Sequence, residues 1–182
     1  MRARPFFDPL PFSMITLFRL LARLPMPLMH RLGAMLGWLV WWCAPGYRRR
    51  FKANAESAGF APGQYRPAIA AAGKMASELP WLWLRPHGQT VLDRVVRWEG
   101  VEAFEAAMQA KKGVILVAPH LGSWEMCGQA IGERFLAAYG PITALFRPAR
   151  KKWMADLIAA GSRDRPGLQT LPTNNSGVRG LI

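Results

Sequence analysis

A histidine and a glutamate stand five residues apart in the stretch "APHLGSWEM", and their types suit acid–base chemistry. His120 and Glu125 would diverge in a continuous helix, because positions i and i+5 lie about 140° apart around its axis. A turn at Gly122 would let the two side chains meet. A carboxylate that binds one imidazole nitrogen fixes the tautomer and leaves the other nitrogen to accept a proton from a hydroxyl. This H-x-x-x-x-E motif therefore predicts a general base that works without a protein nucleophile.

Ser123 carries the only hydroxyl beside this pair, which raises the alternative of a serine hydrolase. No aspartate completes a hydrolase triad, and the Gly-x-Ser-x-Gly turn of such enzymes is absent. We therefore reject a serine hydrolase. A further interpretation makes His120 a core histidine and Glu125 a helix-capping residue, since so short a motif often occurs by chance.

The elements expected around the motif favour a functional site. Residues 114–119 (VILVAP) form a continuous apolar run, which is typical of a strand buried on both faces of a parallel or mixed sheet. His120 would then stand at the carboxyl end of a strand, where ligand crevices form in open α/β sheets. Ser123 suits the N-cap of a helix that begins at Trp124 and has Glu125 in its first turn.

The surrounding sequence extends this alternation of strands and helices. Residues 95–100 predict a short strand, and residues 101–112 have the periodicity of a helix that Gly113 would end. Short helices broken by prolines are expected over residues 51–98. The expected fold class is α/β, with a mixed sheet flanked by helices in residues 48–182.

The N-terminal part, residues 1–47, is strongly apolar and predicts a membrane anchor. Its longest uncharged stretch, residues 32–47, is shorter than the roughly 20 residues that cross a bilayer comfortably. Three tryptophans near its end favour the lipid–water interface, and the basic run at 48–52 attracts anionic headgroups on the cytoplasmic side. We expect one or two membrane-embedded or interfacial helices. The alternative is a buried hairpin of core helices.

Composition narrows the class of partner. The chain has 182 residues, of which 51% are hydrophobic, and a formal net charge of +13. Such a charge implies an anionic partner: nucleic acid, anionic lipid or a phosphorylated substrate. No helix-turn-helix, zinc or RNA-binding signature accompanies it, so we expect no nucleic-acid partner. No Cys/His cluster has metal-ligand spacing, and no metal or other cofactor is expected.

The motifs together resemble a known family. "HLGSWEM" is similar to the catalytic block of the lipid A late acyltransferases, a branch of the lysophospholipid-acyltransferase-like superfamily. "YRRRFKANAE", "KKGVILVAPHLGSWEM", "PITALFRPARKKWMADLI" and "RDRPGLQTLP" with "GVRGLI" resemble further family blocks in the same order. The resemblance spans most of residues 30–182, and Ser123 stands where the family more often has Asn.

The resemblance implies acyl transfer from an acyl carrier protein thioester to a hydroxyl of a lipid A precursor, at the cytoplasmic face of the bacterial inner membrane. His120 would be the general base, and Glu125 would orient and charge-balance it. Arg147 would bind phosphate of the acceptor or carrier, with a weaker, similar part for Arg163. Backbone amides near Ser123 and Trp124 are one source of donors for the developing oxyanion.

Other assignments remain open at this point. The acceptor could be a phosphatidylinositol mannoside, a glycerolipid or an aminolipid, because related acyltransferases share the motif in outline. A non-catalytic membrane-anchored scaffold is a further alternative. The family usually continues beyond "GVRGLI", so we expect a C-terminally truncated domain.

Overall fold

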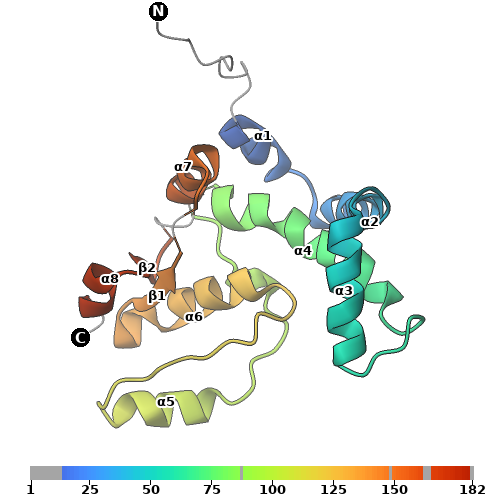
Figure 1. The fold of residues 1–182 in the computed structure, drawn as a ribbon. Helices are drawn as coiled ribbons and strands as arrows, with labels where there is room; N and C mark the ends of the chain where they lie inside the picture. Colours follow the sequence, from blue (N-terminus) through green and yellow to red (C-terminus); the bar gives the residue numbers. More distant parts are fainter. Residues whose placement is uncertain (1–13, 87, 148, 162–164, 181–182) are drawn as a thin grey trace, which may run out of the picture.

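The computed structural model describes residues 14–86, 88–147, 149–161 and 165–180 (Figure 1). This part of the chain is mostly helical and has a small parallel sheet of two strands. The elements in chain order are α1 (Met14–Leu21), α2 (Met26–Cys43), α3 (Pro45–Ser57), α4 (Arg66–Leu84), the 3-10 turn η1 (Leu92–Arg94), α5 (Val101–Gln109), α6 (Trp124–Tyr139), β1 (Ile142–Phe146), α7 (Lys152–Gly161), β2 (Leu168–Pro172) and α8 (Asn175–Arg179).

Helix α4 is the central element, because it contacts the N-terminal helices as well as α6 and α7 (Figure 1). Its closest partner is α2, and glycines allow the two backbones to approach. A Cβ added to Gly73 of α4 would lie 2.0 Å from the carbonyl oxygen of Gly33 in α2. Gly33 and Gly37 form a G-x-x-x-G pattern, which permits this kind of close helix packing.

The described part of the N-terminal segment forms the helices α1 and α2. Among the described helices, none has the length and apolar character that crossing a bilayer requires. One side of α2 is buried against α4, including Met29 and Trp41. Large apolar side chains elsewhere on α1 and α2 are exposed: Met14, Leu17, Leu20, Leu28, Leu32, Met35, Leu36, Leu39, Val40 and Trp42. Helix α2 thus has one buried and one exposed apolar side, whereas no residue of α1 is fully buried.

The predicted mixed sheet is wrong in extent and in type. Strands β1 and β2 pair in parallel, from Ile142 opposite Leu168 to Phe146 opposite Pro172, and α6 contacts both. Residues 114–119 are extended but join no sheet, and they run alone between α5 and α6 (Figure 1). Residues 95–100 form no strand either.

The side chains of residues 114–119, which were expected to form a buried strand, are mostly exposed to solvent. The side chains of Ile115 and Val117 are 92% and 90% exposed. An apolar run has β propensity, but a strand is stable only when neighbouring strands satisfy its backbone and cover its side chains. No described strand pairs with this segment, and most of its side chains stay exposed, so it lacks both kinds of support. The helices were predicted better: α5 lies within the predicted 101–112, and α6 begins at Trp124 as expected.

Candidate active site

His120 ends the exposed extended segment and turns the chain towards α6. Its backbone φ is 55°, in the left-handed region that few residues other than glycine adopt, and Gly122 follows with φ 59°. These two positions form the predicted turn between the segment and the helix. The His120 ring packs against Trp124 in a tilted arrangement, with centroids 4.4 Å apart and an interplanar angle of 37°. The turn thus holds the imidazole against the first residue of α6.

The His120 ring nitrogens are set by the backbone rather than by Glu125. Nδ1 lies 3.1 Å from the carbonyl oxygen of Ala118. A carbonyl can only accept, so this hydrogen bond needs the proton on Nδ1 and leaves Nε2 as the basic nitrogen. The sequence predicted a carboxylate in that role. In the structure Nδ1 faces the Ala118 carbonyl, because the left-handed turn folds the ring back over its own chain, and the basic nitrogen is again Nε2.

Glu125 lies in the first turn of α6 and is half-buried. Burial raises the pKa of its carboxyl, while an interaction with the Trp83 indole N–H and the charge of His120 lower it. Glu125 is therefore within electrostatic reach of the imidazole, although the two side chains form no hydrogen bond with each other. The Trp83 Nε1 atom is buried and has no partner at ordinary hydrogen-bond geometry. Trp83 was not predicted as part of the site, since its contact with Glu125 joins residues from two helices.

Ser123 occupies the N-cap position of α6 as predicted, but its side chain does not cap the helix. Its carbonyl accepts a 2.9 Å hydrogen bond from the Met126 amide. The first N–H groups of a helix have no intrahelical partner, so those of Trp124 and Glu125 are open to a ligand. Positive helix-end potential and free donors together suit a developing negative charge.

Of the two predicted arginines, the structure describes only Arg147, and it does not bring that residue to this pair. Arg147 follows β1 directly and is exposed. No contact with His120 or Glu125 is present in the described structure. Arg163 lies outside the described residues. Likewise, no group of three or more His, Cys, Asp or Glu side chains in the described ranges is placed to hold a metal ion.

A buried polar network fixes α6 against the end of α4. Arg85 is 2% exposed and donates to Glu133 Oε1 at 2.6 Å and to Gln129 Oε1 at 2.5 Å. The other Glu133 oxygen accepts from the Thr90 hydroxyl at 2.6 Å and the Val91 amide at 2.9 Å. Burial lowers the pKa of Arg85, and Glu133 raises it. The sequence analysis missed this network, although an arginine in the apolar run "LWLRP" was a signal.

Comparison with known proteins agrees with the motif at the start of α6. The family model described as bacterial lipid A biosynthesis acyltransferase matches residues 10–182. No curated protein and no solved structure gives a significant match. The family match covers nearly all of the chain, including the turn with His120, helix α6 and both strands. The chain therefore belongs to the bacterial lipid A biosynthesis acyltransferase family.

Proposed function

We propose that this protein transfers a fatty acyl chain from an acyl carrier protein thioester to a hydroxyl of a lipid A precursor, with His120 as the general base. The proposal rests mainly on the hydrogen bonding of the His120 ring. Its Nδ1 faces a backbone carbonyl, which leaves Nε2 basic on an exposed imidazole beside the first turn of α6. The family match supplies the reaction class.

The chemistry needs one base and no covalent enzyme intermediate. His120 Nε2 removes the proton from the acceptor hydroxyl as its oxygen attacks the thioester carbonyl carbon. A C–O bond forms, and the carbonyl oxygen gains negative charge that the open amides of Trp124 and Glu125 can stabilise. The C–S bond then breaks, and the leaving thiolate takes the proton back from the imidazolium. The product is an ester and a free carrier thiol.

Glu125 supports the charged intermediate of this cycle. The imidazolium forms only after proton removal, so a nearby carboxylate stabilises it when charge has developed. The electrostatic coupling between Glu125 and His120 supports this role. Arg147 and Arg163 would bind phosphate of the acceptor or the carrier, because a guanidinium donates two parallel hydrogen bonds to phosphate oxygens.

The exposed apolar sides of α1 and α2 would place the enzyme at the cytoplasmic face of the bacterial inner membrane. These helices would lie in the interface rather than span the bilayer, with the basic residues 48–50 and Lys52 near anionic headgroups. A cell-fractionation experiment tests this placement. The protein should pellet with membranes and need detergent for release, and recovery in the soluble fraction at low salt would contradict it.

An acyl-transfer assay tests the mechanism. Detergent-extracted protein would be incubated with acyl carrier protein thioester and lipid A precursor, and mass spectrometry would detect one added acyl chain. His120→Ala should lower turnover by about 10²–10⁴-fold, the usual cost of losing a general base. Lys112→Ala, an exposed residue before the same segment, is the matched control and should retain wild-type turnover. If the acyl chain were transferred to a glycerolipid or aminolipid instead, the proposed acceptor would be wrong, but His120 would remain the general base.

A further inference from the structure

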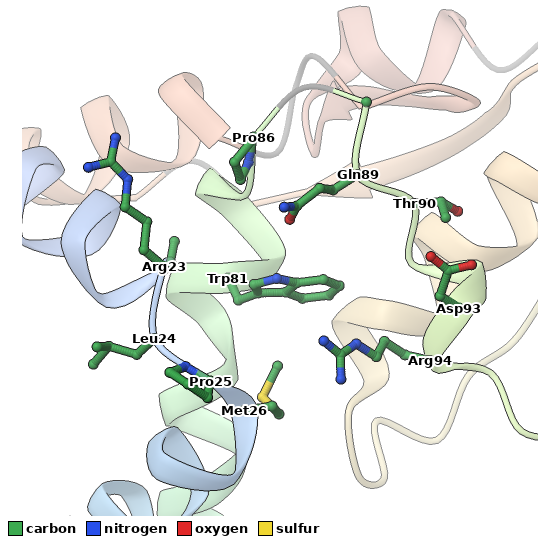
Figure 2. A pocket seen from close by; sticks show the side chains of 12 residues that line it. Arg23, Leu24, Pro25, Met26, Trp81, Pro86, Gln89, Thr90, Asp93 and Arg94 are labelled. Carbon is green, nitrogen blue, oxygen red and sulfur yellow. The ribbon is translucent and has the colours of Figure 1, made fainter.

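A pocket of about 660 Å³ opens where the turn between α1 and α2 meets the end of α4 and η1 (Figure 2). Its lining contains neither His120 nor Glu125, so it is separate from the residues proposed for acyl transfer. Pockets of this size hold small ligands or lipid headgroups. The lining combines two features, free cations and an apolar floor.

The cations are Arg23, beside the α1–α2 turn, and Arg94, at the end of η1. Figure 2 shows the Arg94 guanidinium next to the Trp81 ring, and Arg23 on the other side of the pocket with its side chain extended outward. The Arg94 guanidinium lies over the Trp81 ring, 5.6 Å from its centroid. Within the described part of the chain, no carboxylate forms an ion pair with either arginine. Asp93 also lines the pocket, so the three side chains leave one net positive charge.

The apolar part of the lining comes from the same turn. Leu24, Pro25 and Met26 line the pocket on one side, and the buried Trp81 indole lies at its centre (Figure 2). The exposed Leu20 precedes this turn and the exposed Leu28 follows it. Exposed leucines thus stand on both sides of the pocket-lining turn along the chain.

We propose that this pocket binds the phosphate-bearing headgroup of an anionic lipid. Guanidinium groups that lack a carboxylate partner are suited to phosphate, which they bind through parallel hydrogen bonds. The guanidinium groups of Arg85 and Arg94 lie over the Trp81 ring. Pro25 and Met26 would therefore supply the apolar contact for the glycerol or sugar next to that phosphate. The acyl chains would leave along Leu20 and Leu28. The site goes beyond the proposed acyl transfer, because it needs neither a donor thioester nor His120.

Binding measurements on the full chain in a neutral detergent test this site. The probes are a short-chain phosphatidylglycerol, the phosphorylated lipid A precursor, and a short-chain diacylglycerol that lacks phosphate. Wild type should bind at least one of the phosphorylated probes in preference to diacylglycerol. Arg23→Gln/Arg94→Gln should weaken that binding by roughly tenfold or more, the scale of lost charged hydrogen bonds. Both substituted residues are exposed, so the fold should persist, and circular dichroism would verify it.

Lys111→Gln/Lys112→Gln is the matched control, since it removes the same charge from exposed positions after α5, outside the pocket. It should change binding less than twofold. Equal losses in the two double variants, or equal binding of diacylglycerol, would overturn the proposal. Phosphatidylglycerol binding would assign a membrane phospholipid, and binding of the precursor alone would assign the acceptor lipid.

His120→Ala separates this proposal from the proposed reaction. That variant should bind the phosphorylated lipid as wild type does, even though acyl transfer is lost. A loss of binding in His120→Ala would mean that the lipid occupies the catalytic residues instead of the pocket, and would overturn the assignment of the site.

Discussion

The buried ion pair between Arg85 and Glu133 should dominate the stability of the region that carries the active-site helix. Glu133→Ala removes the carboxylate that accepts from Arg85, Thr90 and Val91. Arg85 is 2% exposed, so its charge would stay buried without an ionic partner. Removing one member of such a pair costs about 3–5 kcal/mol, because the desolvated charge is no longer compensated. This is a large part of the 5–15 kcal/mol or so that stabilises an ordinary domain.

Asp156→Ala provides the matched comparison. Asp156 accepts from Lys152 at 2.8 Å, nearly the same distance as in the Arg85–Glu133 pair, but its side chain is 48% exposed and that of Lys152 is 87% exposed. Solvent-exposed pairs one helical turn apart contribute about 0.3–0.5 kcal/mol. The same kind of contact should thus differ about tenfold in its effect on stability, and the difference in burial is the cause.

Chemical denaturation in detergent, followed by circular dichroism, measures both variants. Glu133→Ala should also lower the melting temperature by roughly 6–20 °C, if each kcal/mol shifts it by about 2–4 °C in a chain of this size. Asp156→Ala should melt within about 2 °C of wild type on the same scale. Similar melting temperatures for the two variants would refute the reasoning, because the Arg85 network would then not hold α6 against α4.

Two further predictions concern helix packing and pH. Gly73→Ala should lower the free energy of unfolding by about 1–3 kcal/mol, because the added Cβ would meet the backbone of α2. Gly46→Ala is the control and should not destabilise the protein, since no atom lies within 4 Å of a Cβ at that position. Equal unfolding free energies for the two variants would contradict this packing. Burial raises the pKa of Glu125 above the ordinary value of 4.5, so the folded state binds this proton more tightly than the unfolded state does. The free energy of unfolding should therefore fall as pH rises from about 4.5 through the raised pKa, and Glu125→Gln should remove that fall. Denaturation measured over this pH range tests the prediction. The same pH dependence in wild type and Glu125→Gln would show that the carboxyl is not desolvated.

Local signals predicted the helical part of the site. A small polar residue, then Trp124 and Glu125, marks the start of α6, and the turn before it follows from Gly122. Such signals act within a few residues, so one sequence is enough to read them. The position of His120 next to α6 was predicted for the same reason.

Features that depend on distant residues were not predicted. Residues 114–119 have the composition of a strand, yet pairing depends on neighbours that the composition does not specify. The contacts of Trp83 with Glu125 and of Arg85 with Glu133 join α4 to α6 across more than forty positions of the chain. The nitrogen of His120 that carries the proton was predicted to face a carboxylate, whereas a left-handed backbone turn brings it to the Ala118 carbonyl.

The acyl-transfer assay with His120→Ala tests the central claim most directly. Wild-type protein should add one acyl chain to the lipid A precursor, and His120→Ala should be slower by about 10²–10⁴-fold while Lys112→Ala is not. Near-wild-type transfer by His120→Ala would contradict the account, because a group other than His120 would then take the proton from the acceptor hydroxyl.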